Sequence, residues 1–361
     1  MVSDHKSIGY SDDFSEVDAV ESLVQPFGPR LVRLYWLLVQ PAFPILYRKG
    51  FMKLYEASYR NIGAALLGAV YLKALAWWTY DPELSLRSLP DAGKLRRLTL
   101  GAIQNSFHRP RLSSIEGMLI YLHCRPEEPL TADHTYARGL TSQLLAISEA
   151  IGLHTDASQW AIPKWERAER KRIAWAVYMQ DKWTALAYGR PSHITLDNWG
   201  VQDLTDDDFD MEEDGHGGAV KPGTGQNYFS LMVDLTKILG KVLSEFFTIR
   251  TCQDQDTSEL FEKAQPLLQE LAPWREKLYV TLPITSPRAR QLCSVSKWLF
   301  PTRLFDIGIS DANRSRLPPP LLSRRRCQSI QTACSLISSR ALLFRCCRSL
   351  CRPTTGHAVR T

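Results

Sequence analysis

The 361-residue chain lacks several features that would assign it to a class of protein at once. Residues 1–20 are polar and acidic, with no apolar stretch of the kind that a secretory signal peptide needs. Without that signal the eight cysteines do not argue for a disulfide framework, because thiols stay reduced in the cytosol and nucleus. Long alternation of polar and apolar residues is also missing, which excludes a large antiparallel sheet.

Catalytic and membrane-spanning features are equally scarce. The sequence contains no G-x-S-x-G, H-E-x-x-H or G-x-G-x-x-G motif, and its eight histidines are dispersed. We therefore expect no enzyme, no catalytic residue and no cofactor in this chain. Residues 61–78 form the longest apolar stretch, but Lys73 lies inside it, where a membrane would demand a partner for the ammonium group. A buried helix explains the stretch better, so we expect no membrane contact.

Acidic side chains are absent from residues 312–361, which hold ten Arg and no Lys. The rest of the chain carries 34 Lys and Arg against 38 Asp and Glu, so the net charge of +6 comes from this tail. The ten like charges predict that residues 312–361 are disordered. The Arg-, Ser- and Cys-rich composition of the divergent residues 285–361 is typical of a shifted reading frame or a retained intron. The alternative is a genuine basic arm that serves as a nuclear signal or contacts phosphates, through Arg314, Arg316, Arg324, Arg325 and Arg326.

Nearly every periodic segment predicts a helix. Leu140, Leu144 and Ile147 begin one apolar stripe of a 3.6-residue repeat, and similar stripes lie over residues 228–246 and 261–274. Ser113, followed three residues later by Glu116, resembles a capping box at a helix start. Only residues 278–282 allow a short strand. The sequence therefore predicts an all-α fold with many helices.

An acidic and glycine-rich segment, residues 205–226, divides the helical pattern into two blocks. Seven acidic residues fall between Asp206 and Asp214, and five glycines follow. Such a segment cannot bury enough apolar surface to order itself, so we expect a solvated linker; a calcium or acidic interaction site is the alternative. The predicted organisation is a disordered segment (1–30), a helical core (31–204), the linker (205–226), a continuing helical region (227–284) and the divergent tail (285–361).

Residues 160–198 carry the most information. Pro163 suits the first turn of a helix, and Gly189 and Pro191 mark its end. Glu166 and Glu169 lie three or four residues from arginines of the same helix, so the basic run is better explained by pairing along the helix than by nucleic-acid binding.

Asp181 stands among Trp175, Met179 and Trp183, where an unpaired carboxylate would be costly to bury. We expect an arginine partner, either Arg190 or Arg172, that pins the turn after the helix to its shaft. Because no supporting His, Ser or second carboxylate is evident nearby, we interpret Asp181 as structural rather than as a catalytic acid or base.

One longer pattern runs through this region and comprises Ile151-Gly152-Leu153-His154, Trp160, Trp165-Glu166-Arg167, Arg172, Trp175, Asp181, Gly189-Arg190-Pro191 and Ile194. It resembles the fungal-specific transcription factor domain, the middle homology region of fungal zinc-cluster regulators. Upstream it continues in Tyr35-Trp36, Pro41, Phe43-Pro44-Ile45-Leu46 and Phe51, and the likeness extends to Leu282. Residues 179–183 and 189–194 are most similar to regulators of nitrogen-compound and carbon-source catabolism.

The resemblance implies a nuclear regulator that senses or relays a signal, often by self-association or through other transcription regulators. Zinc is expected only in the family's N-terminal six-cysteine cluster, which is also its DNA-contacting part. The first cysteine here is Cys124, so we expect that module to be missing from this truncated chain. DNA contact would then come only through the missing cluster, or non-specifically through the basic tail.

Two other functions remain open. A helical module could enclose a small-molecule effector among Trp77, Trp78, Trp175 and Trp183, with no transcriptional role of its own. An unrecognised enzyme is the remote alternative.

Overall fold

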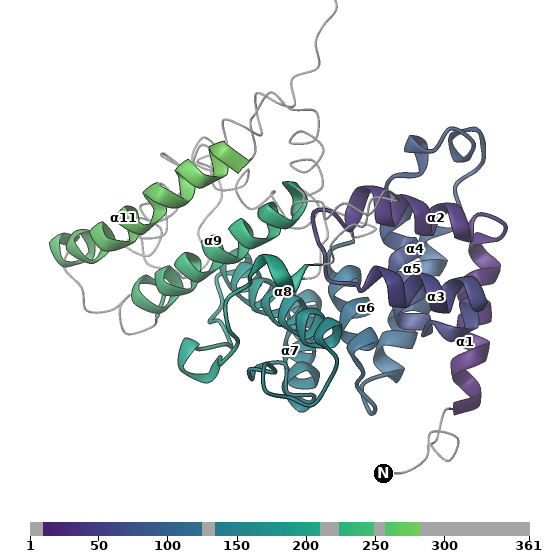
Figure 1. The fold of residues 1–361 in the computed structure, drawn as a ribbon, viewed down its shortest axis with the longest axis horizontal. Coiled ribbons are helices and arrows are strands. Elements are labelled where there is room, and N and C mark those ends of the chain that lie inside the picture. The colour runs from purple at the N-terminus through teal and green to yellow at the C-terminus, as the bar shows by residue number, and fades with distance from the viewer. Residues whose placement is uncertain (1–9, 125–133, 210–223, 249–256, 282–361) are drawn as a thin grey trace, which may run out of the picture.

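The computed structural model describes residues 10–124, 134–209, 224–248 and 257–281, and these ranges contain ten α-helices and no strand. The predicted all-α class is therefore confirmed. The helices form two groups that follow each other along the chain, α1 to α6 and α7 to α11 (Figure 1). The tail arginines 314, 316 and 324–326 lie outside the described residues.

The first group is built around α4 (Ala64–Leu75), whose residues are all buried. It packs against α1 (Tyr10–Val24), α2 (Gly28–Leu34), α5 (Ala92–Asn105) and α6 (Leu112–Leu122). A π-helical turn (Tyr35–Val39) continues α2, and α3 (Arg48–Ala57) follows it. Helix α4 is apolar all round because helices surround it.

The crossing of α4 and α6 depends on Gly117. A Cβ atom at this position would lie 2.8 Å from the carbonyl carbon and oxygen of Ala65. Real Cβ atoms do not approach backbone that closely, so a larger residue would force the two helices apart. Short 3-10 turns at Tyr59–Asn61, Trp78–Tyr80 and Leu84–Leu86 connect the helices of this group.

The expected disorder of residues 1–30 is wrong for residues 10–30. Helix α1 packs against α4 and α5, and its residues Val17, Val20 and Val24 are buried. Their spacing of three and four residues forms an apolar stripe, which the acidic residues between them obscure in the composition. The buried Glu21 carboxylate accepts a 2.7 Å hydrogen bond from the Tyr71 hydroxyl of α4.

The predicted apolar helix around Lys73 is α4, and the buried ammonium group donates a 2.6 Å hydrogen bond to the backbone carbonyl of His123. This carbonyl lies just after α6, so the lysine ties the ends of two helices together. Among the described residues, no helix combines the length and apolar character that a membrane crossing requires.

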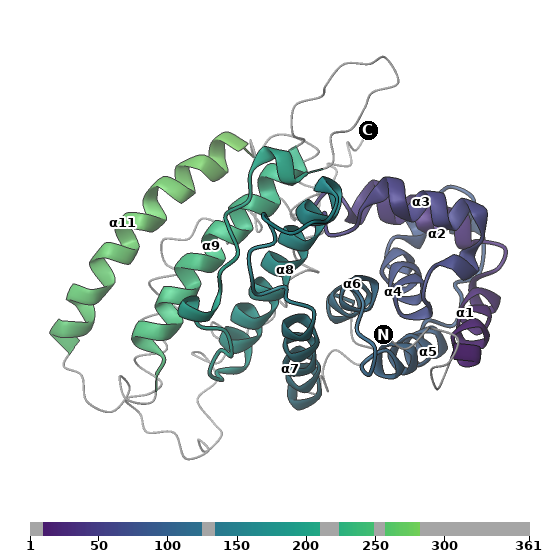
Figure 2. The same cartoon turned by 60° about the horizontal axis from the view of Figure 1, so that its bottom comes forward.

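The second group is layered. Helices α11 (Thr257–Thr281), α9 (Thr224–Phe246) and α8 (Lys164–Tyr188) lie side by side in that order (Figure 2). Helix α7 (His134–Ala150) packs against both α8 and α6. The Trp274 indole of α11 is buried and donates to the backbone carbonyl of Leu231 in α9 at 2.7 Å.

Three local expectations need correction. Residues 278–281 belong to α11, so a strand there is wrong; residue 282 lies outside the described residues. Helix α6 begins at Leu112 after Arg111, and Glu116 is buried inside it instead of forming a capping box with Ser113.

The third correction concerns the start of the expected linker. Residues 206–208 form a 3-10 turn with a capping box, in which the Thr205 and Asp208 side chains each accept a hydrogen bond from the other residue's backbone N–H. Asp208 and Phe209 are buried. Residues 205–209 are therefore part of the folded body. Residues 210–223 lie outside the described part of the chain, and α9 starts at Thr224, three residues before the expected boundary.

Candidate functional site

Helix α8 organises the region that the sequence singled out. It begins after Pro163 and, as the sequence predicted, ends at Gly189. The Gly189 φ of +59° is left-handed. The Arg190 N–H then donates to the Ala185 carbonyl and closes the helix end. Arg190 and Pro191 are exposed beyond it. This helix carries most of the polar side chains described below.

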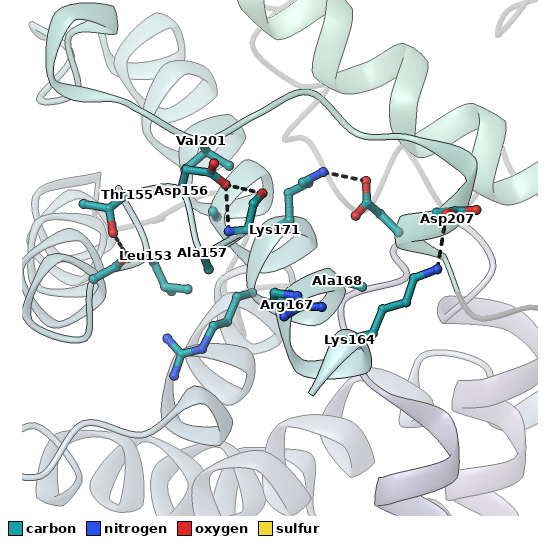
Figure 3. Close-up of a pocket in the computed structure, with 15 residues that line it drawn as sticks. Leu153, Thr155, Asp156, Ala157, Lys164, Arg167, Ala168, Lys171, Val201 and Asp207 are labelled. Carbon is teal, nitrogen blue, oxygen red and sulfur yellow. Dashed lines mark hydrogen bonds and ion pairs between the residues drawn. The ribbon is translucent and has the colours of Figure 1, made fainter. Parts of the chain in front are cut away.

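A cavity of about 240 Å³ lies beside the first half of α8. Its walls come from three segments: the loop after α7, one face of α8, and the segment that contains Val201 and the 3-10 turn at Asp206–Asp208 (Figure 3). The lining residues are Gly152, Leu153, Thr155, Asp156, Ala157, Ser158, Lys164, Arg167, Ala168, Arg170, Lys171, Ala174, Val201, Asp207 and Asp208. We call this cavity the α8 pocket.

Charges of both signs line the α8 pocket. Lys171 Nζ lies 2.8 Å from Asp208 Oδ2, and Lys164 Nζ lies 3.2 Å from Asp207 Oδ2. Both pairs connect α8 to the segment after it, as Figure 3 shows. The second pair is exposed and contributes little to stability, whereas the first is largely shielded from water.

The aromatic and acidic residues at the start of α8 contact different partners. Trp165 is 44% exposed and stacks on Tyr47 with ring centroids 4.8 Å apart. Glu166 accepts from Arg170 at 3.1 Å, the pairing along the helix that the sequence predicted. The Arg170 guanidinium also lies over the Trp160 ring, 5.2 Å from its centroid.

Arg172 is almost completely buried and does not pair with Asp181. Its Nε donates to the Pro44 carbonyl at 2.6 Å, and its Nη1 donates to the Asp208 carbonyl. The side chain thereby joins α8 to two loops more than thirty residues away on either side. This explains in physical terms why an arginine stands at this position of the pattern.

A pair of buried carboxyl groups links the two helix groups. Glu116 of α6 is hydrogen-bonded to Glu169 of α8, and Glu169 also accepts from the Tyr47 backbone N–H at 2.9 Å. Burial and the neighbouring Glu169 charge raise the pKa of Glu116 well above its usual value, and Arg172 offsets this only in part. Two carboxyl groups at hydrogen-bond distance share one proton, so the Glu116 carboxyl carries it.

The expected arginine partner of Asp181 is wrong. The carboxylate is fully buried and accepts four hydrogen bonds from the turn that follows the helix. The donors are Ser192 Oγ at 2.6 Å, Ile194 N at 3.0 Å, His193 N at 3.1 Å and His193 Nδ1 at 2.9 Å. The left-handed Gly189 reverses the chain so that residues 192–194, instead of Arg190, reach the carboxylate.

Contrary to the sequence interpretation, His and Ser side chains do lie near Asp181. His193 Nε2 is 3.1 Å from the Ser142 hydroxyl and 3.3 Å from Arg138 Nη2, and both of these residues are on α7. The Ser142 hydroxyl is also within hydrogen-bond distance of the Arg138 carbonyl. The chain of contacts runs from α8 through the turn to α7 and holds the three segments together.

The ionisation of this cluster follows from its contacts. Burial acts to raise the pKa of Asp181, but the Ser192 hydroxyl and the backbone N–H groups of Ile194 and His193 outweigh it and lower the pKa below its usual value. Burial also lowers the pKa of Lys182 although Asp181 lies 3.7 Å away. The Lys182 ammonium group donates to Ser192 Oγ and to the Ile194 carbonyl, so both charges are held by the same turn.

The four tryptophans considered as an effector enclosure do not line the α8 pocket. Trp175 donates to the Gln202 carbonyl at 2.9 Å, and Trp183 donates to Thr236 Oγ1 at 2.9 Å. Trp77 and Trp78 are buried at the end of α4, where the Trp78 ring contacts Phe27 edge to face. Trp77 and Trp78 therefore belong to the first helix group, and Trp175 and Trp183 to the second.

Metal-binding groups are not assembled in the part of the chain that the structure describes. No three His, Cys, Asp or Glu side chains in these residues are grouped to hold a metal ion. Cys124 is the one cysteine within the described ranges, and its thiol contacts the Ile120 carbonyl. These residues do not fit a six-cysteine zinc cluster.

The described residues thus form an all-helical body with a small charged pocket beside α8. Comparison with known proteins gives the family. The fungal specific transcription factor domain matches residues 32–282, more than half of the chain. The chain belongs to this family.

The relatives are fungal transcription regulators. The transcriptional activator protein DAL81 of Saccharomyces cerevisiae is 31% identical over 319 residues, which are 78% of this chain and 32% of that protein. The cutinase transcription factor 1 alpha of Fusarium vanettenii is 24% identical over 61% of this chain and 24% of its own length. The acetamidase regulatory protein of Aspergillus fumigatus is 23% identical over 73% of this chain and 35% of its own length.

The chain thus spans about a third of the length of these relatives or less. No solved structure matches it.

Proposed function

We propose that this chain is the regulatory region of a fungal zinc-cluster-type transcription factor, and that it controls metabolic genes without contacting DNA bases itself. The family match carries the proposal, because residues 32–282 include nearly all of the described helical body. The names of the relatives support a metabolic role, since one regulates an acetamidase and another a cutinase. The comparisons point to a regulator rather than to an enzyme.

The family also suggests where the chain acts and with what. We place it in the nucleus, with a second copy of the chain or other transcription regulators as partners. Zinc belongs to the family's cysteine cluster, and the described residues offer no such ligand set. The buried networks around Arg172 and Asp181 would keep the helical body rigid while its surface engages those partners.

A reporter assay tests the proposal. The full chain is fused to a heterologous bacterial DNA-binding domain in a fungal host, with a reporter gene behind the matching operator. We expect reporter output to differ several-fold from that of the DNA-binding domain alone and to change with the nitrogen or carbon source. Output equal to that of the DNA-binding domain alone under every condition would reject a regulatory role.

A second candidate function is small-effector binding, and the α8 pocket is the observation that favours it. Its volume of about 240 Å³ lies just below the roughly 300–1,000 Å³ of pockets that hold drug-sized ligands. Only a small metabolite would fit. The two functions are compatible, since an effector could act through the same regulatory region.

A further inference from the structure

The basic residues that line the α8 pocket are not equivalent. Lys164 pairs with Asp207, Arg170 pairs with Glu166, and Lys171 pairs with Asp208. Each of these three charges is compensated by a carboxylate at 3.2 Å or less. A ligand would have to displace an existing partner in order to use them.

Arg167 differs from these three residues. Its Nη1 donates to the backbone carbonyls of Trp160 at 3.2 Å and Ile162 at 3.1 Å, and no carboxylate of the described residues pairs with it. Two neutral carbonyls fix the guanidinium in place but leave its charge uncompensated. They also leave the edge formed by Nε and Nη2 free, and this is an edge that grips a carboxylate through two parallel hydrogen bonds.

Asp156 is the corresponding acidic group, in the loop after α7 that forms another wall of the pocket. Its Oδ1 accepts from the Ser158 backbone N–H at 3.1 Å and from the Ser158 hydroxyl at 2.7 Å. These bonds orient the carboxylate, and within the described residues no lysine, arginine or histidine pairs with it. Asp156 comes from the loop after α7 and Arg167 from α8, and both side chains border the cavity in Figure 3.

Apolar atoms complete the lining of the α8 pocket. Leu153, Ala168, Ala174 and Val201 also line the pocket, so a short hydrocarbon segment would lose water there at no polar cost. One uncompensated cation, one uncompensated anion and an apolar wall together describe the outline of a small zwitterion.

We propose that the α8 pocket binds a small metabolite of the amino-acid class, with its carboxylate on Arg167 and its ammonium group on Asp156. The inference rests on the proposed function, because it assigns an effector to the regulatory region. It goes further by naming the pocket, the two contact residues and the ligand class. The pairs Lys164–Asp207 and Lys171–Asp208 then hold the walls in position and do not touch the ligand.

Calorimetric titration of the purified full chain tests the ligand class. The probes are glycine, 3-aminopropanoate, 4-aminobutanoate and 5-aminopentanoate, which increase the separation of the two charges one carbon at a time. Propanoate and propylamine each retain only one charge, and inorganic phosphate is the purely anionic probe. We expect at least one amino acid of the series to bind at least tenfold more tightly than propanoate, propylamine and phosphate.

Equal affinity for the amino acids and propanoate would overturn the role of Asp156, and tighter binding of phosphate would overturn the zwitterion. Absence of binding by the whole series, with the chain shown to be folded by circular dichroism, would overturn the site. The pocket variants Asp156→Asn and Arg167→Lys should each weaken binding of the best probe at least tenfold. Asp197→Asn, the matched control at an exposed carboxylate outside the pocket lining, should change it less than threefold.

The result is independent of the reporter assay. If the amino acids bind and the reporter stays silent, the pocket stands and the transcriptional role fails. If the reporter responds to the nutrient but no amino acid binds, the transcriptional role stands and this assignment fails.

Discussion

Replacement of Asp181 by Asn is the sharpest test of the network that closes α8. The carboxylate accepts from two backbone N–H groups, His193 N on Oδ1 and Ile194 N on Oδ2. Asparagine offers one oxygen, so its amide nitrogen must face one of these donors whichever way the side chain is turned. A buried donor without a partner costs about 1–3 kcal/mol, and Lys182 loses the carboxylate at 3.7 Å.

The net loss is smaller than the sum of these effects, because the variant no longer buries a charge. We expect Asp181→Asn to lower the free energy of unfolding by about 2 kcal/mol. For a folded body of this size that corresponds to a fall of roughly 4–8 °C in Tm. Equilibrium urea unfolding followed by circular dichroism measures it, and Asp197→Asn, an exposed position on the neighbouring turn, is the matched control.

The pH dependence gives a second check on the same variant. Because the folded-state pKa of Asp181 is lowered, its stabilising contribution is present above the unfolded value of about 3.9 and is lost as the pH falls through the folded-state pKa. The difference between wild type and Asp181→Asn should therefore be constant from pH 5 to 7 and shrink only in stronger acid. A variant that unfolds at the wild-type urea concentration at pH 7 would refute the reasoning.

Two further substitutions test other parts of the account. Gly117→Ala should destabilise the protein by about 1–3 kcal/mol, because the added methyl group overpacks the α4–α6 crossing. The control Gly101→Ala, in open space on α5, should be neutral or stabilise by up to about 1 kcal/mol. Equal effects of the two variants in urea unfolding would contradict the close approach of α4 and α6. Glu116 has a raised folded-state pKa, so its ionisation costs stability as the pH rises above about 4.5. Glu116→Gln should therefore gain stability relative to wild type between pH 5 and pH 8, and the exposed Glu56→Gln should not; a gain that does not change with pH would count against the shared proton.

The boundaries of α8 could be predicted from the sequence because local residues set them. Pro163 directly precedes the first residue of α8, where its missing N–H costs no helical hydrogen bond, and Gly189 ends the helix with a positive φ. Neither boundary needed tertiary information. The pairing of Glu166 with Arg170 was predictable for the same reason, since residues four apart meet on one helix face.

The partners of Asp181 and Arg172 could not be predicted in this way. Asp181 accepts hydrogen bonds from residues that follow a reversal of the chain. Arg172 donates hydrogen bonds to the carbonyls of Pro44 and Asp208, which only the packed fold brings close to it. The run from Ser192 to Ile194 was visible in the sequence pattern, but nothing in it indicated that two backbone N–H groups would point at a carboxylate twelve and thirteen residues earlier.

The α8 pocket was missed because three separated segments build it. Asp156 and Arg167 look like ordinary surface charges in the sequence, and only the pairing of their neighbours shows that these two are uncompensated. Helix α1 was missed for a different reason, since its acidic residues lower the mean hydropathy and hide the stripe of Val17, Val20 and Val24. The mean hydropathy of a segment does not show which face of a helix each residue occupies.

The central claim is that the helical body regulates without reading DNA sequence. Base readout needs an element in a groove with side chains that reach base edges. The most direct test is a fluorescence-anisotropy titration of the full chain with promoter-derived and random duplexes at physiological salt. The account predicts affinities that differ by less than about a hundredfold, with any binding in the roughly 10⁻⁴–10⁻⁶ M range of phosphate contacts and lost on adding salt. A preference above about a hundredfold for one sequence would approach the range of specific recognition and would contradict the account.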